Sequence, residues 1–461
     1  MRARILIAAA ALLGLAGCAT VSEPRPEPLT LPPVWRDVPV QTATAGEGWW
    51  HAVGDETLHA LVAEAQRQNM DVRIAATRVL QARSLVAEAS AETRPRVDAG
   101  VRGDRRRYPP LLYPGFDQPA PASTTTLFFG SIDAAFEIDL FGRLAKGVSR
   151  AQDELHASES DVRTVRLAVT RDLVAAYAEA RTAQERIRLA VEVGSTAARL
   201  NEAEGRLVRA GLTTTRDTRQ AQDLIGAAKA AASSAERDYS LAITRLALLL
   251  GKTPVELSLP PTSWAVDPTR LTIAADLPVK VVERRPDVQA AWLRLSAATT
   301  DIERARLERY PRITLTGALG FASNELNVWL VRNALAWALG AIGSMPLIDG
   351  GRIDARTSFA KAVRDEYAIA YRRTVVAALA DVEQALAEWQ AASAVAEERA
   401  DALVRRRLDL DATTRAIIAG RTDERQRIRD RLAMLEAKRT QAEATLQRVL
   451  AYAAVHHALG R

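Results

Sequence analysis

The chain contains two copies of one long unit, and this duplication constrains its fold more than any other feature. In the first part of each copy the offset between matching residues is 216 positions: Asp71, Val72, Ala75, Arg78, Ala82, Ala89, Pro95 and Arg96 recur as Asp287, Val288, Ala291, Arg294, Ala298, Ala305, Pro311 and Arg312. In the second part it is 209 positions, as in Gly142-Arg143 and Gly351-Arg352, or Ala210-Gly211 and Ala419-Gly420. This period is far too long for a solenoid repeat, so we expect a fold with two pseudo-symmetric halves.

The composition indicates a helical or globular chain. Of the 461 residues, 48% are hydrophobic and 26% are charged, which excludes a disordered chain. The net charge of +6 is small for this length, and acidic residues are interleaved with basic ones almost throughout. We therefore expect solvated helix faces and no nucleic-acid partner.

The N-terminus resembles a targeting segment. A short positive region precedes an apolar run that is too short to span a bilayer, which predicts a signal peptide over residues 1–17. The run ends in Leu-Ala-Gly-Cys18, which resembles the bacterial lipobox, and Cys18 is the only cysteine. We expect a lipid (palmitate) anchor at Cys18, and Ala19 after it suggests the outer membrane. The Pro-rich residues 18–54 are expected to form an extended tether.

Each repeat is predicted to contain a helix, a pair of strands, a long helix and a return helix. In the first repeat (55–250) these are a helix over 55–93, strands within 95–140, a helix over 143–209 and a return helix over 214–250. In the second repeat (284–461) the strands lie within 311–349, the long helix over 352–418 and the return helix over 423–459. Residues 251–283 are expected to be an equatorial linker. The helices 55–93 and 214–250, stacked end to end, are long enough to flank helix 143–209.

The strands carry alternating apolar and polar residues. The alternation is clearest from Phe128 to Leu140, weaker around Val97, and interrupted by glycines over residues 338–348. Loops are expected over 104–126 and 323–336. Long strands with one apolar face are typical of a transmembrane β-barrel, although a two-faced sheet on a soluble core has the same pattern. A transmembrane helix within 328–348 is rejected because the segment is interrupted by Arg332, Asn333, Gly340, Gly343 and Pro346.

Strands of this kind demand association of several chains. Four strands cannot close a membrane barrel, and an open edge in lipid leaves backbone groups unpaired. Two chains would supply about eight strands, which leave almost no lumen, whereas three would supply about twelve. A conduit therefore favours three chains.

Several motifs resemble a known family. They are Leu277-Pro278, Glu283-Arg284-Arg285-Pro286-Asp287-Val288, Tyr310-Pro311-Arg312-Ile313-Thr314-Leu315 and Pro346-Leu347-Ile348-Asp349-Gly350-Gly351-Arg352. They resemble TolC-type outer-membrane efflux channels of the lipidated NodT-like branch, over nearly the whole mature chain.

The resemblance implies a mainly α fold with membrane β structure. Duplicated α-hairpins would form a periplasmic α-barrel, and four strands per chain would contribute to a trimeric 12-stranded β-barrel. It also implies a homotrimer in outer-membrane lipid, a periplasmic adaptor (membrane fusion) protein and an inner-membrane pump of the RND type.

The motif residues themselves are expected to be structural. Pro286 suits a first helical position and Asp287 a helix N-terminus, after Arg284 and Arg285. Gly142 and Gly351 permit a turn from strand into helix, and Arg143 and Arg352 are expected to pair with neighbouring acids.

Functional residues are expected at the two hairpin tips, where the family's tunnel narrows and the adaptor docks. The first tip contains Gly211 and Asp217, and the second contains Gly420, Asp423, Gln426 and Arg429. The family often has an aspartate at the position of Gln426, so this chain departs from an acidic aperture ring. Our hypothesis is that Asp217 and the charged second tip form a salt-bridged closed gate. The alternative is that these charges are solvated and contribute little.

We expect no enzyme, no cofactor and no metal site. The histidines His51, His59, His156, His456 and His457 show no ligand spacing and are interpreted as lone surface residues. The expected function is passive conduction of small molecules out of the cell. The alternatives are a type I protein-secretion outlet and a non-conducting coiled-coil spacer lipoprotein.

Overall fold

The computed structural model describes residues 31–36, 48–53, 56–108, 123–261, 264, 266–273 and 276–461. The chain divides into two compact units, Met1–Pro32 and Pro33–Arg461. Of the first unit only residues 31–32 are described, and they have no regular secondary structure. The expected signal peptide, Cys18 and most of the expected tether lie outside the described residues. All that follows concerns the second unit.

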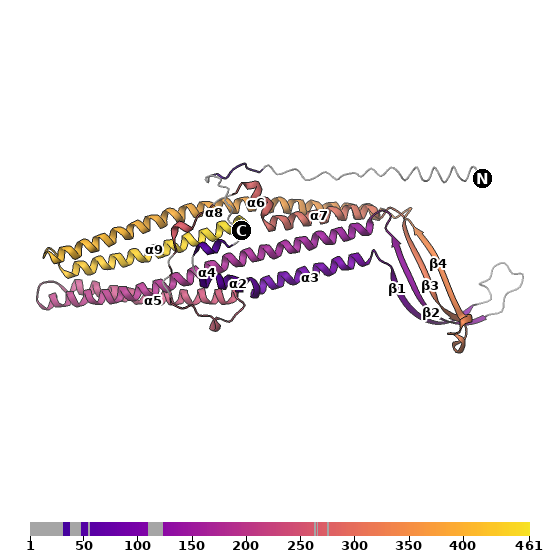
Figure 1. Ribbon diagram of the computed structural model, residues 1–461, viewed down its shortest axis with the longest axis horizontal. Coiled ribbons are helices and arrows are strands. Elements are labelled where there is room, and N and C mark those ends of the chain that lie inside the picture. Colours follow the sequence, from indigo (N-terminus) through magenta and orange to yellow (C-terminus); the bar gives the residue numbers. More distant parts are fainter. Residues whose placement is uncertain are drawn as a thin grey trace. The chain divides into compact units, whose positions relative to one another are not determined.

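The helices and strands of both repeats follow the same order (Figure 1). The first repeat contains η1 (Trp49–Val53), α2 (Glu56–Gln68), α3 (Met70–Ala91), β1 (Arg96–Tyr108), β2 (Ser123–Ile138), α4 (Arg143–Arg209) and α5 (Thr215–Leu249). The segment between the repeats contains the short helices η3 (Pro254–Glu256) and η4 (Pro268–Arg270). The second repeat contains α6 (Pro278–Arg284), α7 (Pro286–Leu307), β3 (Arg312–Ser323), η5 (Leu326–Val328), η6 (Arg332–Ala334), β4 (Leu335–Ser344), α8 (Arg352–Ile418) and α9 (Glu424–Ala458).

The long helices α4 and α8 begin at equivalent turns. Each has 67 residues, a length of about 100 Å. Gly142 precedes α4 at φ 77° and Gly351 precedes α8 at φ 85°, a backbone conformation that residues with a Cβ rarely adopt. Asp139 and Asp349 each accept a backbone N–H of the following first turn at 2.8 Å. The duplicated Gly-Arg pairs therefore mark sharp turns from strand into helix.

Among the described residues, no helix is both long and apolar enough to cross a membrane.

The prediction of one helix over 55–93 is wrong, because Asn69 interrupts it. The Asn69 side chain accepts the N–H groups of Asp71 and Val72 at 2.9 and 3.1 Å and so caps α3. Its amide also donates to the carbonyl of Leu249 at 2.8 Å, which joins the start of α3 to the end of α5. Helices α3 and α5 thus meet end to end, and both of them contact α4.

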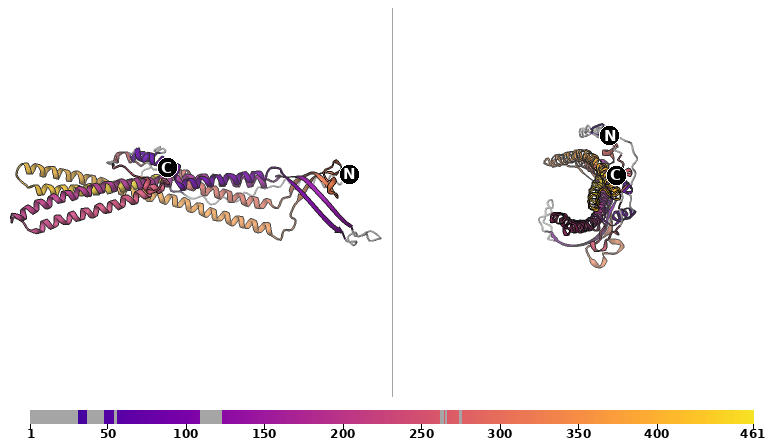
Figure 2. Two further views of the ribbon diagram at one scale, coloured as in Figure 1. Left: turned by 90° about the horizontal axis from the view of Figure 1, so that it is seen from below. Right: turned by 90° about the vertical axis from the view of Figure 1, so that its left-hand side faces the viewer.

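The helices of this unit form a curved wall. α4 packs against α3 and α5 on one side and against α7 and α9 on the other, and α8 packs against α7 and α9. Seen end-on, these helices follow an open arc (Figure 2). The largest apolar core lies at mid-height, where Leu173, Val174 and Tyr177 of α4 are fully buried against α2, α5, α9 and the segment between the repeats.

The four strands form one antiparallel sheet in the order β1-β2-β3-β4. Val101 lies opposite Gly130, Gly130 opposite Phe321, and Phe321 opposite Leu335, so these residues share one face. This face is apolar and mostly exposed: Val101 is 79% and Leu339 81% exposed, although the Trp329 ring covers Gly130. β1 and β4 are the edges of the sheet.

The strand boundaries differ from the predicted ones. The ladder between β1 and β2 continues to Tyr108 and Ser123, into the residues expected to form the loop 104–126. The fourth strand is Leu335–Ser344, which begins and ends earlier than the expected 338–348. Both errors arise where the strand residues lack apolar alternation, so that only the backbone ladder reveals the strand.

The interpretation of His456 as a surface residue is wrong, because its side chain is buried. Its side chain is 1% exposed and stacks on the Trp49 ring at 5.1 Å between centroids. Burial, and next the nearby charge of Arg461, lower the pKa of His456 to about 3. It is therefore a neutral aromatic residue of the core.

Candidate functional site

The two hairpin tips lie at the end of the unit opposite the sheet (Figure 1). Gly211 and Gly420 both have φ 70°, directly after α4 and α8. The N–H of Leu212 donates to the carbonyl of Leu207, and that of Arg421 to Ala416, both at 2.9 Å. Each long helix therefore ends in the same glycine-dependent turn, which satisfies its last carbonyl groups.

Aspartates organise the start of each return helix. At the first tip, Asp217 accepts a hydrogen bond from the Thr213 hydroxyl at 2.8 Å. At the second tip, Asp423 caps α9 by accepting the N–H of Gln426 at 3.2 Å. Arg425 donates to Asp423 at 2.6 Å and lowers the pKa of that carboxyl below its usual value.

A buried carboxylate joins the two tips. Glu204, near the end of α4, is 1% exposed and accepts from Arg425 at 3.1 Å and from Arg429 at 2.8 Å. Both arginines belong to α9, so the contact crosses from the first hairpin to the second. A buried carboxylate needs such partners, because an unpaired charge in the protein interior is very unfavourable. We call Glu204, Arg425 and Arg429 the tip clamp.

Apolar packing and a further ion pair surround the tip clamp. Leu200 of α4, Ala221 of α5 and Ile428 of α9 are buried together. Further from the tip along α4, Glu192 forms an ion pair with Arg431 of α9. The second tip is thus fixed to α4 by both charge and apolar contact.

The pairing expected between Asp217 and the second tip is not found among the described residues of one chain. Glu204 accepts the arginines instead, and its role was missed. The signal was available: Leu200 and Glu204 are four positions apart, which places an acid in the apolar seam of a helix. A contact of Asp217 with a neighbouring chain stays a prediction.

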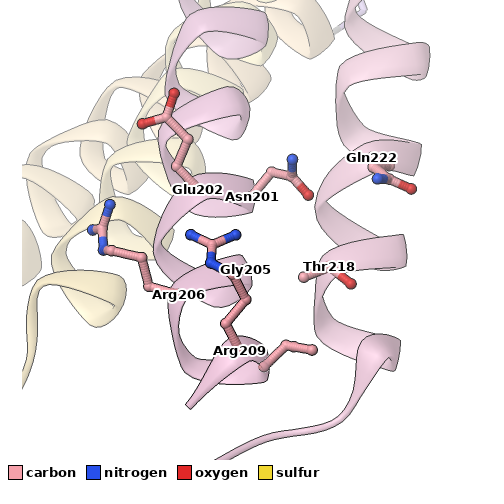
Figure 3. Close-up of a pocket in the computed structure, with 8 residues that line it drawn as sticks. Asn201, Glu202, Gly205, Arg206, Arg209, Thr218 and Gln222 are labelled. Atoms are coloured by element: carbon pink, nitrogen blue, oxygen red, sulfur yellow. The ribbon is translucent and has the colours of Figure 1, made fainter. Parts of the chain in front are cut away.

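An open groove of about 580 Å³ lies between α4 and α5 at the first tip (Figure 3). Asn201 projects toward α5, where Thr218 lines the opposite wall, and Arg209 folds back beside Gly205. Glu202 and Arg206 project on the side of the second hairpin (Figure 3). The groove is polar and exposed, so it offers a surface for contact with another chain and no enclosed site for a small ligand.

The Arg-Arg-Pro-Asp motif lies far from the tips, at the end of α9. Arg285, 6% exposed, pairs with Asp287 at 2.7 Å and with Asp381 at 3.1 Å, and donates to the carbonyl of Ala458 at 3.0 Å. Arg284 pairs with Asp276 at 2.7 Å. Pro286 is the first residue of α7. The motif therefore anchors the last turn of α9 to the start of α7.

The arginines at the strand-to-helix turns contact acids. Arg143 pairs with Glu137 of β2 at 2.8 Å, and Arg352 with Glu308 at 3.6 Å. Each ion pair therefore joins the first turn of a long helix to a residue in or just before a strand of the sheet.

Comparison with known proteins identifies the class to which this arrangement belongs. The sequence model of the outer membrane efflux protein family matches residues 61–252 and 277–461, and the chain belongs to that family. The pyoverdine export outer membrane protein OpmQ of Pseudomonas putida is 29% identical over 455 residues, which cover 95% of both chains. Outer membrane protein OprJ of Pseudomonas aeruginosa is 30% identical over 339 residues, covering 74% of this chain and 70% of OprJ.

Solved structures share the fold. The outer-membrane channel OprN superimposes with a TM-score of 0.81 at 26% identity, covering 96% of this chain and 99% of that one. The resemblance to TolC-type channels is confirmed, and so is the predicted combination of long helical hairpins with membrane strands. The protein is an outer-membrane efflux duct, and its family is a transport family.

Proposed function

We propose that three chains form a closed conduit that passively carries small molecules from the periplasm to the exterior. The observation that carries this proposal is the sheet, which has an exposed apolar face and two open edges, β1 and β4. In lipid such edges must pair, and β1 of one chain can pair with β4 of the next. Twelve strands would then surround a lumen, with the polar sheet face turned inward.

The partners follow from this arrangement. Membership of the efflux protein family supports an inner-membrane pump that supplies the energy, and we propose that this pump is of the RND type. A periplasmic adaptor would bridge the pump and the hairpin tips. The small-molecule substrate class is supported by the name of OpmQ, which matches along 95% of its length and is named for pyoverdine export.

A lipid anchor at Cys18 is part of the proposal. It rests on the lipobox-like sequence before the only cysteine. Metabolic labelling with a palmitate analogue would test it, with Cys18→Ser as the variant that must lose the label. Labelling of that variant would exclude this anchor.

We further propose that the tips form the closed gate. The tip clamp holds the second tip against α4, and Asp217 of one chain would face the second tip of the next. Opening requires these contacts to break, so that the return helices can separate.

Reconstitution in a planar bilayer tests the proposed function. The purified protein should elute in detergent with the mass of three chains and produce stepwise conductance. Asp217→Ala and Arg429→Ala should each increase the conductance, and unchanged conductance in both would contradict the gate. A protein that stays a single chain without detergent would contradict the conduit itself.

A further inference from the structure

The outer end of the β1–β2 ladder carries a polar cluster on the apolar face of the sheet. Arg105 lies opposite Thr126, and Arg107 opposite Thr124. Because side chains alternate along a strand, Arg105 and Arg107 share the face of Val97 and Val101. Val97 is 62% and Val101 79% exposed, so this is the face that meets lipid.

Among the described residues, the arginines of this cluster lack the ion pairs that are present on the opposite face of the strand. On that face, Arg102 and Arg106 both pair with Asp104, at 2.6 and 2.9 Å. Arg105 and Arg107 are exposed, and neither forms an ion pair within the described part of the chain. The strand thus presents paired charges to the lumen and two positive charges, unpaired within the described residues, to the outside.

The height of the two arginines matches the boundary of the membrane. At about 3.4 Å per residue and a tilt of about 40°, Arg105 lies about 21 Å above Val97, and Arg107 about 26 Å above it. The apolar band of a membrane barrel is about 25 Å tall. One step below Arg105, the Phe128 ring covers Gly103, whose missing Cβ would lie 3.4 Å from it. An aromatic residue directly below the charges is the arrangement found at a membrane interface.

The arginines lie at the outer end of the barrel. α3 precedes β1 at Arg96, whereas Tyr108 is at the end of the ladder that points away from the helices. The helical hairpins extend into the periplasm, so Arg105 and Arg107 belong to the outer leaflet.

We propose that Arg105, Arg107, Thr124 and Thr126 bind the phosphate group of a phosphorylated lipid in the outer leaflet. Guanidinium groups bind phosphate through two parallel N–H···O bonds, and the threonine hydroxyls can donate to remaining phosphate oxygens. Residues directly opposite in antiparallel strands have Cβ atoms about 5 Å apart, so one phosphate is within reach of both strands. The inference rests on the sheet crossing the outer membrane and does not depend on the gate.

Lipid retention by the purified trimer tests the site. The probe is a glycolipid with two phosphates (lipid A), mixed with the trimer in detergent and followed by phosphorus analysis after washing. The double variant Arg105→Ala/Arg107→Ala should retain on the order of tenfold less lipid. Arg105→Lys/Arg107→Lys should retain more than the alanine variant, because it keeps the charge. The matched control is Arg102→Ala/Arg106→Ala, on the other face of the same strand, which should retain as much as the wild type.

Either of two retention results would overturn the inference. One is equal retention by the wild type and the Arg105→Ala/Arg107→Ala variant. The other is equal loss in the control variant, which would indicate general damage to the strand. Inorganic phosphate added in excess should not displace the lipid, and displacement would mean that the site recognises free phosphate instead of a lipid. The conductance of each variant should also be measured. Loss of the lipid should leave the conductance unchanged, so a failure of the lipid site can be distinguished from a failure of the proposed conduit.

Discussion

We expect that weakening the tip clamp opens the gate. Glu204→Gln keeps the shape of the side chain but removes the charge that attracts Arg425 and Arg429. Their side chains are 28% and 48% exposed, against 1% for Glu204, so the arginines can regain water when the carboxylate is lost. The cost is therefore smaller than that of a charge left alone in the interior.

We expect the clamp to weaken by about 1.5 kcal/mol in each chain, the value of one hydrogen bond to a charged group. If three chains open together, the closed gate loses about 4.5 kcal/mol, which shifts the open–closed equilibrium roughly a thousandfold. The reverse perturbation, Arg425→Ala with Arg429→Ala, leaves Glu204 buried without its partners and should also lower stability, by about 3 kcal/mol per chain.

Single-channel recording in planar bilayers measures this effect as the fraction of time spent open. Glu204→Gln should raise it strongly at neutral pH. Glu202→Gln is the matched control, because it makes the same change two residues away at an exposed position. It should behave as the wild type.

An unchanged open fraction for Glu204→Gln, in a protein that still assembles as a trimer, would refute the reasoning. The tip clamp would then stabilise the hairpins without holding the gate. Equal opening by Glu202→Gln would also contradict it, because the effect would then come from net charge at the tip.

Three further predictions concern stability, measured as the free energy of unfolding. Arg285→Ala removes the buried partner of Asp287 and of the end of α9, and should cost about 3 kcal/mol. His456 has a folded-state pKa of about 3, below the unfolded value, so stability should fall as pH drops from about 6.5 toward 3; His456→Phe should make this slope shallower by up to about 1.4 kcal/mol per pH unit. Gly142→Ala should destabilise by about 1 kcal/mol because of its φ of 77°, whereas Gly226→Ala, in open space within α5, should stabilise by about 0.5 kcal/mol; opposite signs would contradict the turn argument.

Much of the fold follows from local pattern. The long helices cover Arg143–Arg209 and Arg352–Ile418, the ranges expected from their lack of proline and the glycines at both ends. The turns at those glycines could be predicted because a left-handed backbone conformation depends on one residue alone. Alternation located β2 and β3 for the same reason, since the period of two is visible within a single strand.

The errors fall where a distant residue decides the outcome. Asn69 breaks a helical pattern because its amide meets Leu249, 180 residues away. His456 is buried because the ring of Trp49, near the opposite end of the sequence, stacks on it. The outer parts of β1 and β2 were expected to be a loop, because their residues show no apolar alternation. Arg105 and Thr126 are paired through the backbone ladder, which the sequence does not reveal.

The sequence by itself therefore determined the duplicated hairpins, the lengths of their helices, the glycine turns and the amphipathic strands, because each is encoded in neighbouring residues. Only the tertiary structure decided which charges meet. Glu204 lies 221 residues before Arg425 and 225 before Arg429. Whether such residues come into contact depends on the rotation and offset of helices packed against one another, and the periodicity of a single helix contains no information about either.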